Sequence, residues 1–208
     1  MEKEIIGYDE KGQPIYRKPY AIYVHGFGSG AASGTKSSLA RDLGDYEWLC
    51  PEITHDPFES LAILNEWAAT FSPALIAGTS MGGMLALYVD CPTAVRAAVN
   101  PSMSLEKSLR RKGYGQHPYL CERENGETHY TIDEPMIRRF IDFREQQTIH
   151  TGARAIALFS TDDEVSGKES SKQSAAILEA AGVEILWSDK FGHRLNDKAT
   201  KILKKALV

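Results

Sequence analysis

Short apolar segments alternate with longer segments of helical periodicity along most of this chain, and that alternation restricts the folds available to it. Apolar runs of strand length occupy residues 20–24, 46–50, 74–77, 97–99, 155–159 and 183–187. Helical patterns fall between and after them, at residues 36–43, 57–72, 84–89, 169–180 and 196–206. Parallel strands buried on both faces have near-continuous apolar sequences, and helices usually connect them. The pattern therefore predicts an α/β fold, with a mainly parallel sheet and helices on both of its faces.

Two segments interrupt the alternation. Residues 4–16 contain two short apolar runs on either side of a polar turn at 9–12, which predicts a small hairpin. Between residues 101 and 150, 16 residues are charged (eight basic and eight acidic), and helical patterns remain only at 105–111 and 134–146. We expect one domain over residues 1–208, with an N-terminal hairpin at 1–18. Residues 101–150 are expected to form a mainly helical, lid-like insertion, and an ordinary surface excursion is the alternative.

Composition narrows the classes of function. The chain has 208 residues, of which 42% are hydrophobic and 25% charged, values typical of a globular domain. Its formal charge of −4 gives no broad basic surface, and no apolar run reaches membrane-spanning length, so we expect neither a nucleic-acid nor a membrane partner. The start of the chain is charged and lacks the apolar stretch of a secretory signal. Three widely spaced cysteines, Cys50, Cys91 and Cys121, favour reduced thiols and a cytoplasmic location. Composition does not predict the oligomeric state.

The clearest chemical signal is the sequence Gly-Thr-Ser-Met-Gly-Gly at residues 78–83, which follows an apolar strand and precedes a helical segment. This context fits a nucleophile elbow, in which a serine occupies a tight strand-to-helix turn. Residues two positions away crowd such a turn, so very small residues are needed there, as Gly78 and Gly82 are. The helix N-terminus directs free N–H groups at a developing oxyanion, and Met81 N–H would be the first donor. We predict Ser80 as the nucleophile; a structural glycine–serine turn is the alternative.

A nucleophilic serine needs a base, and the elbow fold orders its triad as serine, acid and then histidine along the chain. That order excludes His25 and His55 as bases. The three histidines of the polar insertion are expected to be solvated surface residues. His193 follows the last predicted strand, which places it at the same sheet edge as Ser80. We therefore predict His193 as the base.

The acid should lie on the loop after the preceding strand, where Asp162, Asp163 and Glu164 are adjacent. One of these carboxylates should accept a hydrogen bond from the histidine ring and stabilise its cation. The others would be solvated or would hold the loop. Asp163 is the first choice and Asp162 the second.

A second oxyanion donor should come from the loop after the first strand of the sheet. The sequence His-Gly-Phe-Gly at residues 25–28 fits, with Phe27 N–H as the candidate donor. Its glycines let the backbone approach a substrate oxygen closely. His25 is expected to be a structural residue that bonds this loop.

Taken together, these residues resemble the α/β-hydrolases, and more narrowly the small YqiA-like esterase family. The matching stretches run from about residue 20 to the end of the chain, at 23–27, 36, 78–83, 99–101, 161–165 and 192–193. In that family the acid directly precedes Glu-Val, which the resemblance transfers to Asp163. The resemblance implies hydrolysis of small acyl esters and acyl thioesters without a cofactor. The hairpin at 1–18 has no counterpart in the family, and Gly28 stands where a polar residue is usual.

Two other functions compete with a serine hydrolase. The glycine-rich loop at residues 28–37 resembles a phosphate-binding loop, but Thr35 separates Gly34 from Lys36 and breaks the GxxxxGK[ST] pattern. A non-catalytic ligand-binding protein on the same fold is the other alternative, because a fold does not dictate a function. The expected function is a carboxylesterase or thioesterase-type serine hydrolase acting on a small acyl substrate, with neither metal nor cofactor.

Overall fold

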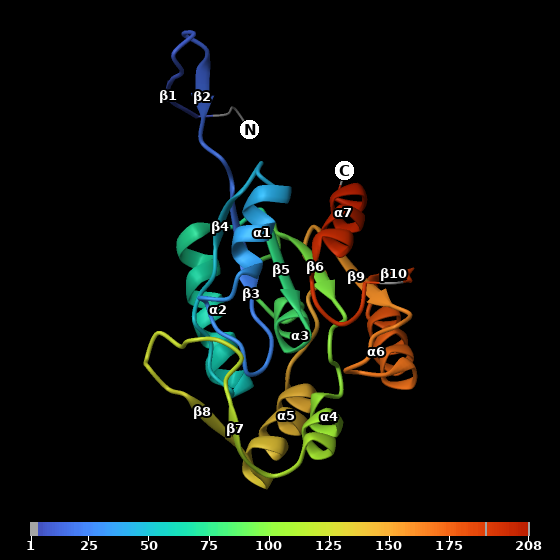
Figure 1. Cartoon of the computed structure of the whole chain (residues 1–208). Helices are drawn as coiled ribbons and strands as arrows, with labels where there is room; N and C mark the ends of the chain where they lie inside the picture. Colours follow the sequence, from blue (N-terminus) through green and yellow to red (C-terminus); the bar gives the residue numbers. More distant parts are fainter. Residues whose placement is uncertain (1–3, 190, 208) are drawn as a thin grey trace.

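A twisted sheet of six parallel strands forms the centre of the molecule in the computed structural model, which describes residues 4–189 and 191–207. The strand order is β10-β9-β6-β5-β3-β4, and every neighbouring pair is parallel (Figure 1). The strands are β3 (Tyr20–Val24), β4 (Glu47–Leu49), β5 (Leu75–Thr79), β6 (Val95–Val99), β9 (Arg154–Ser160) and β10 (Glu184–Ser188). All six lie within two residues of the apolar runs in the sequence, so the predicted parallel α/β sheet is confirmed.

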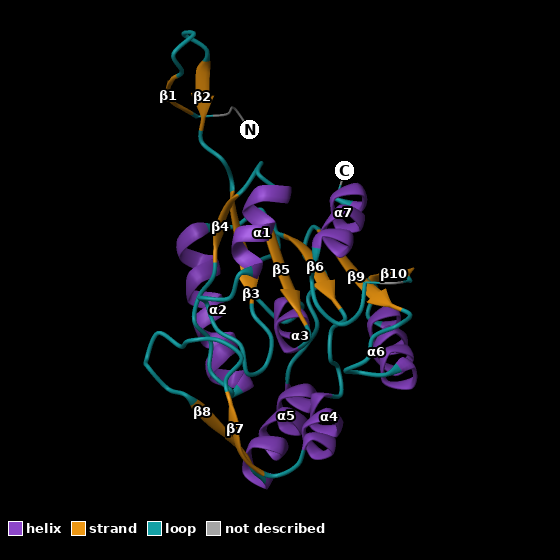
Figure 2. Cartoon of the chain, viewed as in Figure 1, coloured by secondary structure: helices purple, strands orange, loops and turns teal. Residues whose placement is uncertain are grey.

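Helices cover both faces of this sheet (Figure 2). One face packs against α1 (Thr35–Asp42) and α7 (Asp197–Ala206), and the other packs against α2 (Pro57–Phe71), α3 (Met81–Ala86) and α6 (Lys168–Ala180). Successive side chains of a strand point to opposite faces. Tyr23 accordingly belongs to the core under α1 and α7, whereas Ile22 and Val24 belong to the core under the other three helices. Both layers bury apolar surface, which is the main source of stability in such a fold.

Helix ends follow the capping signals of the sequence. Asp56 accepts hydrogen bonds from Phe58 N at 2.8 Å and Glu59 N at 3.2 Å, and Pro57 occupies the first turn of α2. The helix ends at Ser72, whose φ of 44° lies in the left-handed region. The expected helix at residues 84–89 was wrong in its bounds, because α3 begins directly after Ser80 and ends at Ala86.

Residues 101–146 lie beyond the carboxyl ends of the strands, and the segment after them runs back to the amino end of β9 (Figure 1). They form α4 (Leu105–Lys112), a hairpin of β7 (Gly115–Pro118) and β8 (His129–Ile132), and α5 (Glu134–Gln146). Both helices were expected, but the hairpin was not, so the description of the insertion as mainly helical was incomplete. The hairpin has weak sequence signals: β7 is the polar stretch Gly-Gln-His-Pro, and only Tyr130 and Ile132 of β8 are buried.

The N-terminal hairpin extends away from the rest of the molecule, at the amino edge of the sheet (Figure 1). It consists of β1 (Ile5–Tyr8) and β2 (Pro14–Tyr16), as the sequence predicted. Several of its apolar side chains are exposed, among them Ile6 and Tyr8. Within the described part of the chain, no helix has the length and apolar character needed to cross a membrane.

Candidate active site

Ser80 occupies the turn between β5 and α3, with a φ of 58° and a ψ of −120°. A positive φ is strained for a serine, and such strain concentrates at functional sites. The flanking glycines explain how the turn is possible. A Cβ on Gly82 would lie 2.0 Å from the carbonyl oxygen of Val24, and one on Gly78 would lie 2.3 Å from the carbonyl oxygen of Gly82. The turn therefore has the geometry that the nucleophile-elbow pattern describes.

The hydroxyl of Ser80 has a neighbour that sequence reasoning did not single out. Ser102 Oγ lies 3.2 Å from Ser80 Oγ, and the Ser102 N–H donates to the Ser80 carbonyl at 3.2 Å. Ser102 is buried and directly follows the Asn-Pro pair after β6. Among the described residues, the Ser80 hydroxyl is hydrogen bonded to Ser102 and not to His193. Catalytic hydrogen bonds are often long or incomplete before substrate binds.

Asp163 and His193 are joined by a buried hydrogen bond. His193 Nδ1 lies 2.9 Å from both carboxylate oxygens of Asp163, and the two residues are only 8% and 5% exposed, respectively. Asp163 Oδ1 also accepts the N–H groups of Val165 and Ser166, each at 2.9 Å. Burial would raise the pKa of Asp163, but the His193 hydrogen bond and charge, with the two backbone donors, outweigh burial and lower it. The carboxylate is therefore held ionised beside the imidazole.

The other two carboxylates of this loop bind the backbone of the His193 loop. Asp162 Oδ1 accepts the Gly192 N–H at 3.1 Å, and Glu164 Oε2 accepts the His193 N–H at 3.1 Å. The structure thus gives the three adjacent carboxylates different contacts, and only Asp163 bonds the imidazole. Asn100, which was not predicted as a site residue, follows β6 and binds the same loop.

The loop after β3 carries Phe27, whose backbone N–H is the second candidate oxyanion donor. Neither this N–H nor that of Met81 has a hydrogen-bond partner in residues 4–189 and 191–207. His25 is buried, and its Nε2 accepts the Ile53 N–H at 3.2 Å, which is a structural contact. The Phe27 ring packs edge-on against His55 and Tyr130, with centroid separations of 4.6 and 5.1 Å. These aromatic contacts fix the loop.

A buried ion pair between Arg123 and Glu52 binds the same loop. Arg123 forms an ion pair with Glu52, and its guanidinium also donates to the carbonyls of Ser29 and Ile53. Glu52 in turn accepts the Ala31 N–H at 3.0 Å. Arg123 belongs to the β7–β8 connection, which sequence reasoning treated as polar surface. The pair therefore anchors part of the insertion to the loop that carries Phe27.

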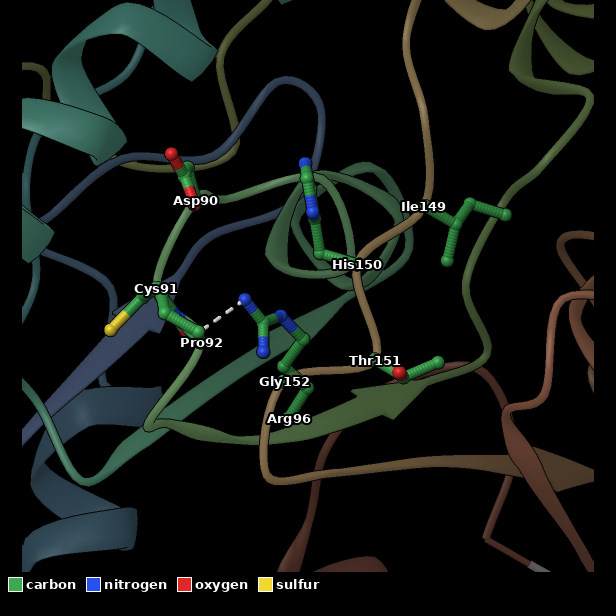
Figure 3. A pocket seen from close by; sticks show the side chains of 8 residues that line it. All are labelled: Asp90, Cys91, Pro92, Arg96, Ile149, His150, Thr151 and Gly152. Atoms are coloured by element: carbon green, nitrogen blue, oxygen red, sulfur yellow. Dashed lines mark hydrogen bonds between the residues drawn. The ribbon is translucent and has the colours of Figure 1, made fainter.

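A separate cavity of about 280 Å³, whose lining side chains are drawn in Figure 3, lies near the amino ends of β6 and β9, whereas Ser80 follows the carboxyl end of β5. Its lining includes Asp90, His150 and the fully buried Arg96. The Arg96 guanidinium donates to the carbonyls of Val89, Ala94 and Cys91, the last at 3.0 Å. These bonds make Arg96 a structural residue, so the cavity contains no arrangement comparable with that around Ser80.

Among the described residues, no group of three or more His, Cys, Asp or Glu side chains could hold a metal ion.

Comparison with solved structures establishes the fold. A proposed hydrolase of the alpha/beta superfamily from Xanthomonas campestris pv. campestris is 19% identical, with a TM-score of 0.56 over 91% of this chain and 98% of that one. Mouse alpha/beta hydrolase domain-containing protein 10 is 11% identical, with a TM-score of 0.65 over 92% of this chain and 88% of that one. Esterase PE8 is 15% identical, with a TM-score of 0.53 over 91% of each chain. The chain therefore has the α/β-hydrolase fold.

Sequence comparison assigns the family. No curated protein matches the chain significantly. The profile of the Uncharacterised protein family (UPF0227) matches residues 20–206, which leaves out the N-terminal hairpin and includes every residue of the candidate site. The resemblance to the YqiA-like family is thereby confirmed, and the chain belongs to the UPF0227 family.

Proposed function

We propose that this chain is a serine hydrolase that cleaves carboxylic esters or acyl thioesters through an acyl-enzyme on Ser80. The observation that carries the proposal is the buried Asp163–His193 hydrogen bond at the same sheet edge as the strained Ser80. A carboxylate that orients a histidine near a serine on an elbow is the arrangement of a serine-hydrolase triad. The hydrolase fold of the structural relatives supports the same class of chemistry.

The first half of the reaction forms the acyl-enzyme. His193 Nε2 accepts the proton of the Ser80 hydroxyl as Ser80 Oγ attacks the substrate carbonyl carbon. Asp163 stabilises the imidazolium that results, and its buried, ionised carboxylate suits that role. The imidazolium then protonates the leaving alcohol or thiol as the bond to the carbonyl carbon breaks. For this transfer the Ser80 hydroxyl must donate to His193, so Ser102 can then bond Ser80 Oγ only as a donor.

The second half releases the acid. His193 takes a proton from water, whose oxygen attacks the acyl carbon, and the proton returns to Ser80 Oγ as the acyl-enzyme bond breaks. In both halves the oxyanion would lie between the N–H groups of Phe27 and Met81. Both groups have no partner within the described residues, and backbone N–H groups directed at a developing charge contribute strongly to such reactions.

We further propose that the protein is cytoplasmic and needs no cofactor. A small or partly exposed acyl group is the expected substrate, because the hydrolase core without hairpin and insertion is short. The phosphate-binding alternative is weakened by the Gly28–Ala31 region. There Glu52 accepts the Ala31 N–H, so a carboxylate of the chain itself already binds this backbone donor and it is not free for a phosphate. A non-catalytic binding protein remains the competing proposal.

Ester hydrolysis and covalent labelling test the proposal together. Wild type, Ser80→Ala and His193→Ala are assayed against p-nitrophenyl esters and acyl-CoA thioesters of increasing chain length. We expect both variants to lose turnover while they retain wild-type circular dichroism. A fluorophosphonate should label wild type at Ser80 and leave Ser80→Ala unlabelled. Wild-type turnover in Ser80→Ala would refute the hydrolase, and failure to label wild type would favour the binding protein.

A further inference from the structure

Asn100 is a buried residue placed between the end of β6 and the loop that carries His193. It directly follows Val99, is 1% exposed and has a φ of 44°. Its backbone N–H donates to the Leu158 carbonyl of β9 at 2.8 Å, which fixes the residue to the sheet. A non-glycine residue at positive φ carries strain, and asparagine tolerates that region better than most others.

The side chain of Asn100 makes three hydrogen bonds to backbone groups of two other segments. Its Nδ2 donates to the carbonyls of Gly192 and His193, each at 2.9 Å. Its Oδ1 accepts the Ser160 N–H at 2.8 Å, at the end of β9. The amide orientation is chemically determined, because an N–H must face the oxygen and two carbonyls must face the NH₂ group. Both amide hydrogens and the oxygen are therefore used.

These bonds complement those of the acidic loop. Asp162 and Glu164 accept the N–H groups of Gly192 and His193, whereas Asn100 donates to the carbonyls of the same two residues. The backbone N–H and the carbonyl of His193 are thus bound by the side chains of Glu164, which follows β9, and Asn100, which follows β6. Aspartate at position 100 would lack the two donors, and glycine would lack all three bonds.

We propose that Asn100 is a positioning residue for His193, an inference that rests on the proposed function. By holding the His193 carbonyl, Asn100 fixes the backbone from which the imidazole contacts Asp163 and, in the proposed reaction, accepts the Ser80 proton. A displacement of about 1 Å in a reacting group can cost about 10²-fold in rate. Loss of the Asn100 amide should therefore lower kcat by about 10- to 100-fold with little change in KM.

The test uses Asn100→Gly, which keeps a backbone suited to positive φ and removes the side chain. Ser72→Gly is the matched control, because Ser72 also has a φ of 44° but ends α2 at the opposite edge of the sheet. Asn100→Asp is the second variant: it keeps the size and the acceptor and replaces the donors with an oxygen that repels both carbonyls. Each variant is compared with wild type for kcat, KM and the far-downfield ¹H NMR signal of the imidazole proton shared with Asp163.

We expect Ser72→Gly to match wild type in all three readouts. The Asn100 variants should lose kcat and show a shifted or broadened downfield signal, with a folded circular dichroism spectrum. If Asn100→Gly does not fold, Asn100→Asp decides the question. A folded Asn100 variant with kcat within twofold of wild type and an unchanged downfield signal would overturn the proposal. If Ser80→Ala still cleaves esters, the proposed function fails, whereas the NMR signal still reports whether Asn100 positions His193.

Discussion

Arg123 and Glu52 form an ion pair whose side chains are only 4% and 15% exposed. Removal of one partner from a buried pair leaves an uncompensated charge and typically costs about 3–5 kcal/mol. Arg123→Met should therefore lower the free energy of unfolding by about that amount, measured by urea denaturation. Arg138→Met is the control, since the exposed Arg138–Asp142 pair should contribute less than about 1 kcal/mol. Equal losses in the two variants would contradict the structural role of Arg123.

Asp163 and Asp162 should differ sharply in their effect on catalysis. Only Asp163 bonds the imidazole, whereas Asp162 binds the Gly192 N–H. We expect Asp163→Asn to lower kcat by about 10³- to 10⁴-fold, because the amide no longer stabilises the imidazolium. Asp162→Asn should lose less than about 10-fold, since it weakens contacts with the Gly192 N–H and the Ser160 hydroxyl, which hold the loop. Parallel measurement of kcat in the two variants checks this order, and a larger loss at Asp162 would reverse the assignment.

Ser102 competes for the Ser80 hydroxyl in the free protein. Its Oγ lies 3.2 Å from Ser80 Oγ, and when Ser80 is the donor that bond must break before His193 can accept the Ser80 proton. A hydrogen bond of this kind has a net value of about 1 kcal/mol, equivalent to about fivefold in rate. Ser102→Ala should therefore raise the rate constant of fluorophosphonate labelling by up to about fivefold. A fall in this rate would instead show that Ser102 assists the nucleophile.

Gly82 and Gly83 should respond differently to alanine. A Cβ at Gly82 meets the Val24 carbonyl oxygen at 2.0 Å, whereas a Cβ at Gly83 meets its nearest neighbour, the Gly78 carbonyl oxygen, at 3.1 Å. Since two backbone segments must separate to admit it, Gly82→Ala should abolish fluorophosphonate labelling and lower the thermal midpoint. Gly83→Ala requires a smaller shift and should retain more of both properties. Tm and labelling rate measured on both variants check the order.

His55 should make stability depend on pH. Burial, together with the charge of Arg123, lowers the pKa of His55 to about 4 from an ordinary value of 6.5. The unfolded chain then binds a proton that the folded chain excludes, so the free energy of unfolding decreases as the pH falls from 6.5 to about 4. The contribution is no more than about 3 kcal/mol. His55→Phe should flatten this part of the stability curve in urea titrations, and an unchanged slope would contradict it.

The order of strands and helices was predictable because each core segment has a local signal. Apolar runs predicted the parallel strands, and the Asp56-Pro57 pair indicated the start of α2. The elbow was predictable for the same reason, since its glycines are required within four residues of one another. Chain order and sheet edge selected His193 and limited its partner to three adjacent carboxylates, of which Asp163, the first choice, contacts the imidazole.

What remained unpredicted depends on contacts between distant segments. Ser102 is 22 residues from Ser80, and Arg123 reaches Ser29 across 94 residues. Neither residue type is unusual at its position, so only the packed structure shows that each reaches the candidate site. The β7–β8 hairpin was missed because β7 is a polar stretch that contains glycine and proline, and the alternation of β8 covers only four residues.

The contact of Gly82 with Val24 also bears on how the site moves. The carbonyls of Val24 and His25 lie directly against the first turn of α3, so the backbones of Phe27 and Met81 belong to two segments in main-chain contact. The insertion also contacts this loop, because Arg123 donates to the Ser29 carbonyl and Tyr130 packs against the Phe27 ring. A displacement of the insertion would therefore also shift the Phe27 amide, so the alignment of the proposed oxyanion donors depends on how the insertion is packed.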